Sequence, residues 1–119
     1  MAVYAGAPVC AEAKRELARS GARAGSVRVR VVCTDPVGAK GGLDLAAAGA
    51  NARRAVEDSS AVAYLEAPGP AIPVTRPILD EADLRLLATS SGADGIASVL
   101  RLLRSGDSDE SPRESVWNR

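Results

Sequence analysis

The sequence predicts an α/β fold, a three-layer α/β/α sandwich around a parallel sheet of four or five strands. Two observations lead to this prediction. Short β-prone apolar runs alternate four times with longer segments of helical period along the 119 residues. Parallel strands need long, right-handed connections, and a helix after each strand supplies them. We expect a single domain over residues 1–106 and a polar tail over residues 107–119, in which the S-P-R-E capping box predicts a short last helix.

The first half of the chain contains two predicted strands and one helix. Residues 2–6 form a β-prone run that stops just before Pro8. Residues 10–20 carry an apolar stripe with a charged back and end at Gly21, which predicts a helix. Residues 26–33 are the clearest strand, because their alternating valines lead into a continuous apolar run, as is typical near a sheet edge.

The second half of the chain repeats this alternation. A glycine-rich loop over residues 37–42 precedes Asp44, whose carboxylate is a good helix cap. The further elements follow in order: a helix over 45–57, a strand over 61–65, a helix over 72–82, a strand over 84–87 and a helix over 93–105. This succession of elements is Rossmann-like or flavodoxin-like.

The composition argues against several classes of function. Fifteen basic residues balance 15 acidic ones and only 3% of the residues are aromatic, so we expect no nucleic-acid surface. The chain has no histidine, the commonest general base and metal ligand, and we expect neither catalysis nor a metal site. No apolar run approaches the roughly 20 residues that span a bilayer, so no membrane insertion is expected.

Cofactor motifs are also missing from the sequence. The stretch over residues 38–42 is rich in glycine but lacks the spacing of a phosphate-binding loop, and it is interpreted as a linker. No dinucleotide-binding glycine motif follows the first predicted strand. We therefore expect no cofactor.

Cys10 and Cys33 are the two cysteines of the chain. Their separation fits neither a zinc-binding pattern nor a CxxC redox pair. The favoured interpretation is two inert thiols. The alternative is a disulfide, on the hypothesis that both residues end neighbouring strands. Cys10 as a nucleophile would have no histidine base, so we expect it to be a packing residue.

The loops that follow the predicted strands are the candidate binding region, because open α/β sheets place ligands at the carboxyl ends of their strands. The loop after the last strand is the most polar. There Thr89, Ser90 and Ser91 could offer hydroxyl and main-chain N–H groups to a carboxylate or phosphate at the start of a helix. The alternative interpretation is a simple helix cap.

Two motifs resemble a known family. The N-A-R-R helix and short strand over residues 51–65, followed by P-I-L-D-E-A over residues 77–82, are similar to type I periplasmic solute-binding proteins of the branched-chain amino-acid receptor group. The order of segments from Val3 to Ser91 matches the opening of that family's first lobe. The chain thus resembles the first half of an N-terminal lobe, in a truncated or degenerate form.

The resemblance implies non-catalytic binding of a small amino-acid-like solute, for transport with an ABC transporter or for sensing. It also implies a second lobe or a permease as partner, and an extracytoplasmic location if a leader was removed; without the resemblance we expect a cytoplasmic protein. The family's hydroxyl-bearing ligand loop corresponds here to Gly69, Pro70, Ala71 and Ile72. The backbone of Gly69 and the hydroxyls of Ser90 and Ser91 therefore remain as candidate ligand contacts. The alternative function is a protein-interaction or dimerisation module that has lost ligand binding.

Overall fold

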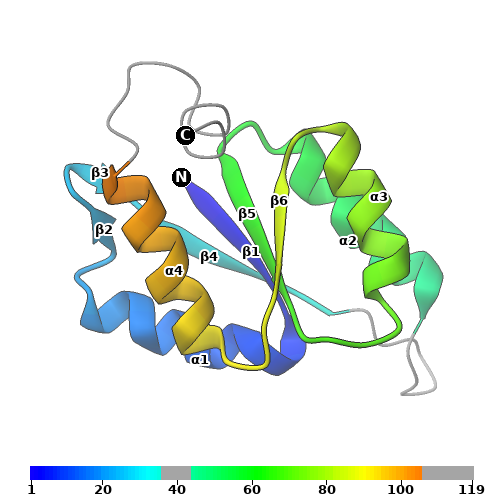
Figure 1. The fold of residues 1–119 in the computed structure, drawn as a ribbon, viewed down its shortest axis with the longest axis horizontal. Coiled ribbons are helices and arrows are strands. Elements are labelled where there is room, and N and C mark those ends of the chain that lie inside the picture. Colours follow the sequence, from blue (N-terminus) through cyan, green and yellow to red (C-terminus); the bar gives the residue numbers. More distant parts are fainter. Residues whose placement is uncertain (36–43, 106–119) are drawn as a thin grey trace.

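A parallel sheet of four strands forms the centre of the molecule (Figure 1). The computed structural model describes residues 1–35 and 44–105. The strands are ordered β4 (Arg30–Thr34), β1 (Ala2–Gly6), β5 (Ala61–Glu66) and β6 (Arg85–Ala88), and each neighbouring pair is parallel. The predicted parallel α/β sheet is confirmed. No fifth strand joins it within the described residues.

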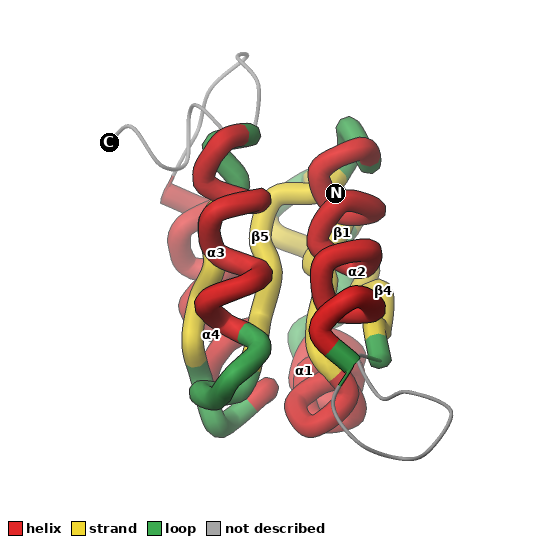
Figure 2. The backbone as a smooth tube through the Cα atoms, turned by 90° about the vertical axis from the view of Figure 1, so that its right-hand side faces the viewer, coloured by secondary structure: helices red, strands yellow, loops and turns green. Residues whose placement is uncertain are grey.

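Two pairs of helices cover the two faces of the sheet (Figure 1). Helices α1 (Ala7–Arg19) and α4 (Gly92–Ser105) pack on one face, and α2 (Leu45–Glu57) and α3 (Ile72–Glu81) pack on the other. Figure 2 looks onto the second face, where α2 and α3 lie side by side. The three-layer α/β/α architecture is as the sequence predicts. None of the described helices is long and apolar enough to cross a membrane.

Small side chains allow the layers to approach closely. Ala48, Ala52 and Ala55 are the buried alanines of α2, and β1 and β5 are buried along their whole length. The hydrophobic core is therefore split into one cluster under α1 and α4 and a second cluster under α2 and α3. Because β1 and β5 are buried on both faces, their sequences are nearly continuous apolar runs and do not alternate with polar residues.

The predicted strand over residues 26–33 is wrong as a single element. Residues Val27–Arg28 form β3, which pairs antiparallel with β2 (Arg23–Ala24) in a separate two-stranded hairpin. Gly25 has a positive φ of 62° at the turn, a conformation that glycine adopts without strain. The chain enters the main sheet only at Arg30, whose amide donates to the Met1 carbonyl oxygen. The turn at Gly25 thus pairs the start of the predicted strand with β2, although the apolar periodicity continues without a break through β3 and β4.

The helix boundaries agree with the sequence prediction to within one residue, except at one end. Asp44 caps α2 as predicted, accepting hydrogen bonds from the amides of Ala46 and Ala47. By contrast, α1 begins at Ala7, three residues before the predicted start. Pro8 lies in its first turn, where a missing N–H group costs nothing, so this proline opens the helix instead of preceding it. The predicted loop 37–42 and tail 107–119 lie outside the described residues.

A polar cluster joins three segments near the amino ends of the strands. The Asp58 carboxylate accepts hydrogen bonds from the Ser60 amide and hydroxyl at 2.9 and 2.6 Å and from the Tyr4 hydroxyl at 2.9 Å. Arg30 lies 3.4 Å away from the same carboxylate. These bonds, Ser60 first, lower the pKa of Asp58 to about 2. The cluster fixes the chain between α2 and β5, at the edge of the sheet opposite to the candidate binding region.

Candidate functional site

The carboxyl ends of all four strands meet at one edge of the sheet, because the strands are parallel. The connection from β1 leads through α1 to β4, and the connection from β5 leads through α3 to β6. These two connections leave in opposite directions, so the topological switch point lies between β1 and β5. Thr34 and Gly6 are register partners at this edge, and Glu66 ends β5 beside them.

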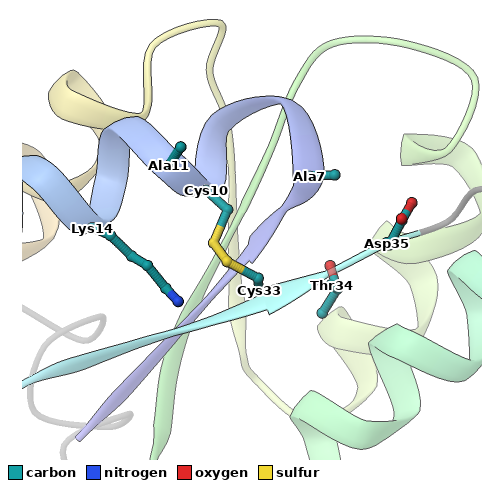
Figure 3. A pocket seen from close by; sticks show the side chains of 7 residues that line it. All are labelled: Ala7, Cys10, Ala11, Lys14, Cys33, Thr34 and Asp35. Atoms are coloured by element: carbon teal, nitrogen blue, oxygen red, sulfur yellow. A yellow bond between two sulfur atoms is a disulfide. The ribbon is translucent and has the colours of Figure 1, made fainter.

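A pocket of about 440 Å³ lies at this edge, where the first two turns of α1 face the end of β4 (Figure 3). Ala7, Cys10, Ala11 and Lys14 line it from α1, and they form a single stripe because their spacing is i, i+3, i+4 and i+7. The remaining lining residues are Cys33, Thr34 and Asp35. The pocket is thus built from one helix face and one strand end.

Opposite charges line the pocket. Lys14 extends from α1 toward β4, and Asp35 follows directly after β4, with the sulfur atoms between them (Figure 3). Both charged side chains are exposed. Thr34 is buried, and its hydroxyl lies 2.9 Å from that of Tyr64, a residue of the core cluster under α2 and α3. The wall of the pocket therefore carries one ammonium group and one carboxylate.

Cys10 and Cys33 form a disulfide, which corrects the prediction of two inert thiols. Their Cα atoms are 5.6 Å apart. Cys10 lies in α1 and not at a strand end, and it reaches Cys33 because α1 returns across the face of β4. The parallel crossover places the two residues together, and this contact between helix and edge strand cannot be inferred from their separation in the sequence.

The predicted residues Thr89 and Ser91 organise the start of α4. The Thr89 hydroxyl donates to the Ser91 carbonyl oxygen at 2.9 Å and accepts from the Ser91 amide at 3.1 Å. The Ser91 hydroxyl accepts from the Asp94 amide at 3.2 Å, so Ser91 is a helix cap. Glu12 of α1 also accepts a hydrogen bond from the Gly92 amide. The capping interpretation of this loop is therefore what the structure shows, and ligand contact by these hydroxyls stays a prediction.

Ser90 and Gly69 are exposed in neighbouring loops. Ser90 lies in the loop after β6, and Gly69 lies in the loop after β5, where its carbonyl oxygen accepts from the Ile72 amide. The Thr89 amide donates to the Glu66 carbonyl oxygen, which joins the ends of the two strands. None of the predicted site residues lines the described pocket, because the pocket lies at the carboxyl end of the outer strand β4, whereas the predicted residues follow β5 and the other outer strand, β6.

Glu66 is a buried carboxyl group at the switch point. It is 6% exposed, and burial raises the pKa of its carboxyl group. A Cβ atom on Gly6 would lie 3.1 Å from Glu66 Oε1, so the carboxyl group occupies the space that this glycine leaves at the end of β1. The sequence suggested a loop beginning at this residue, whereas the structure extends β5 to include it.

Lys14, Asp35 and Glu66 are three charged residues of this edge that sequence reasoning did not select as site residues. The sequence did contain a pattern that pointed to Lys14 and Asp35. Asp35 directly follows the clearest strand, and Lys14 lies one helical turn after Cys10, so both would have been selected once the two cysteines were paired. Within the described ranges, no group of three His, Cys, Asp or Glu residues is placed to hold a metal ion.

The chain matches no protein-family model, no curated protein and no solved structure.

Proposed function

We propose that this chain binds a small amino-acid-like solute, without catalysis, in the pocket between α1 and the end of β4. The observation that carries the proposal is the pair of opposite charges on the pocket wall, Lys14 and Asp35. A free amino acid presents a carboxylate and an ammonium group, and these groups complement that pair. Transport or sensing of the solute is the role that the family resemblance implies.

The size and lining of the pocket support this proposal. Its volume of about 440 Å³ falls in the range of roughly 300–1,000 Å³ that is usual for small-ligand sites. Ala7 and Ala11 provide small apolar walls next to the charged groups. Ligand sites are typically apolar with a few polar groups that fix orientation, and the pocket has this composition.

The expected affinity is weak. Most of the lining residues are exposed, and only Cys10 and Thr34 among them are buried. An open pocket covers only part of a ligand, and binding must still overcome the loss of translational and rotational freedom. We expect dissociation constants near the millimolar range, on the order of 4 kcal/mol of binding free energy.

Isothermal titration with a panel of amino acids, at millimolar concentration, tests the proposal. We expect one or a few amino acids to bind, and Lys14→Gln and Asp35→Asn each to weaken binding about tenfold through loss of a charged hydrogen bond. Arg15→Gln is the matched control, because Arg15 is exposed on the same helix and does not line the pocket.

Analogues of the bound amino acid assign the two charges. If Lys14 holds the carboxylate, the amidated analogue binds the unsubstituted protein less well but binds Lys14→Gln as well as the free acid does.

Absence of heat with every amino acid at 10 times the expected dissociation constant, roughly 10 mM, contradicts the proposal. Equal affinity in both pocket variants also contradicts it. A concentration-dependent dimer in light scattering, together with no binding, would favour an interaction module instead.

A further inference from the structure

The disulfide on the pocket wall has two sulfur atoms in different surroundings. Cys33 is exposed near the end of an edge strand, whereas Cys10, in the first turn of α1, is 2% exposed. Both residues line the pocket. A disulfide that serves only as a covalent link needs no open space beside it. Here the disulfide joins two of the residues that surround the pocket (Figure 3).

The difference in exposure determines which sulfur an incoming thiolate can attack. Exchange begins when a thiolate attacks one sulfur and the other sulfur leaves. The Cys33 sulfur belongs to an exposed residue, while the burial of Cys10 hinders attack there. Cys33 is therefore the entry sulfur and Cys10 the leaving sulfur.

The surroundings of Cys10 favour its role as the leaving group. Cys10 is the fourth residue of α1, so it lies at the end of the first turn, where the helix dipole favours negative charge. Lys14 follows one turn later and lines the same pocket. Burial alone would raise the pKa of a cysteine thiol, whereas a helix amino terminus and a nearby ammonium group lower it and make the thiolate a better leaving group. Lys14 also attracts the incoming anionic thiolate.

We propose that Cys10–Cys33 is an exchange-active disulfide that is reduced in the folded protein by a dithiol. One thiolate of the dithiol attacks Cys33 Sγ; a new S–S bond forms there, the Cys10–Cys33 bond breaks, and its electron pair leaves on Cys10 Sγ. The second thiolate of the dithiol then attacks the dithiol's own sulfur in the mixed disulfide and releases Cys33 as a thiolate. The dithiol is oxidised by two electrons, and its two protons pass through solvent to the two cysteines. This proposal is independent of the solute-binding proposal.

Reduction of the oxidised, folded protein by dithiothreitol without denaturant tests the mechanism. Samples are quenched with acid, alkylated and analysed by mass spectrometry, while circular dichroism follows the fold. We expect complete reduction with a rate proportional to the dithiothreitol concentration and a retained α/β spectrum. A disulfide that persists until denaturant is added would overturn the proposal, as would a rate that reaches a plateau at the rate of global unfolding.

Single variants test which sulfur is the entry point. With oxidised glutathione, Cys10→Ser is expected to form a mixed disulfide at Cys33 at least ten times faster than Cys33→Ser forms one at Cys10. Lys14→Gln is expected to slow reduction of the intact disulfide several-fold, while Arg15→Gln leaves the rate unchanged. Equal trapping at both cysteines would overturn the assignment of Cys33, and an unchanged rate in Lys14→Gln would overturn the role of Lys14. The dithiothreitol experiment on the unsubstituted chain decides the main proposal even if a variant does not fold.

Discussion

The pKa values of two carboxyl groups, Asp58 and Glu66, are shifted in opposite directions for different physical reasons. Asp58 accepts hydrogen bonds from Ser60, Tyr4 and Arg30, which lower the pKa of its carboxyl group to about 2. Glu66 is buried at the end of β5, and burial raises its pKa. Ionised Asp58 therefore stabilises the fold, whereas ionisation of Glu66 destabilises it.

We predict opposite effects when each carboxyl group is replaced by its amide. Asp58→Asn should lower the free energy of unfolding at pH 7 by about 1–2 kcal/mol after allowance for solvent screening. Glu66→Gln should raise it, by on the order of 1 kcal/mol, because no buried carboxyl group then needs to ionise. Urea unfolding of both variants and the unsubstituted protein at pH 7 measures the two differences.

The pH dependence of the unfolding free energy is the control for both variants. The Asp58 contribution is fully present above the ordinary aspartate pKa of 3.8 and is lost as the pH falls toward 2, so the deficit of Asp58→Asn should close in that window. Folding is favoured by protonated Glu66 below the ordinary glutamate pKa of 4.5 and loses that contribution as the pH rises, so the gain of Glu66→Gln should appear only above it. A difference that does not change with pH would contradict the electrostatic explanation for that residue.

At the scale of elements, the contact between α1 and α4 depends on Gly92. A Cβ atom there would collide with the Val9 carbonyl oxygen and lie 2.7 Å from the Ala13 amide nitrogen. These are backbone atoms of a neighbouring helix, so they cannot move aside as a flexible side chain would. The Gly92 amide also donates to Glu12, which joins the start of α4 to α1.

We predict that Gly92→Ala lowers the free energy of unfolding by about 1–3 kcal/mol through overpacking between the two helices. Gly69→Ala is the matched control, because nothing lies within 4 Å of a Cβ atom at that position. Thermal unfolding followed by circular dichroism compares the two variants. Equal melting temperatures for both would show that α4 shifts away from α1 without cost, contrary to the packing seen here.

At the scale of the whole molecule, the disulfide connects an edge strand to the helix that precedes it in the chain. β4 has one neighbour in the sheet, β1, whereas β1 has neighbours on both sides. The disulfide closes a loop with a sequence separation of 23, which includes the β2–β3 hairpin. Closing this loop restricts the unfolded chain more than the folded one.

We predict that the double variant Cys10→Ser/Cys33→Ser remains folded but loses about 3 kcal/mol of unfolding free energy, the value that chain entropy gives for a loop of this length. Chemical denaturation measures the loss, and the unsubstituted protein reduced with dithiothreitol should show the same loss. A double variant as stable as the oxidised protein would mean that the bond adds nothing to the stability of the fold.

The sequence predicted the elements better than it predicted the candidate site. The strand over 2–6, the Asp44 cap and the helix over 45–57 were correct because each depends on neighbours within a few residues. The split of the 26–33 run was missed because the alternating valines continue through β3 and β4, so their periodicity does not show that β3 pairs with β2 across the turn at Gly25. Ser91 was correctly placed at a helix start, but the sequence could not show that its hydroxyl already accepts a hydrogen bond from the Asp94 amide.

Periodicity, caps and turn residues by themselves determined the α/β class, the alternation of helices with the four strands of the main sheet, and the parallel direction of that sheet. Only the tertiary structure decided that β4 lies beside β1 as an edge strand, that Cys10 meets Cys33, and that Lys14 and Asp35 line one pocket. The physical reason is the range of the interactions. A helix or strand follows from neighbouring side chains, whereas a site forms where a crossover brings distant residues together, and no local pattern records that meeting.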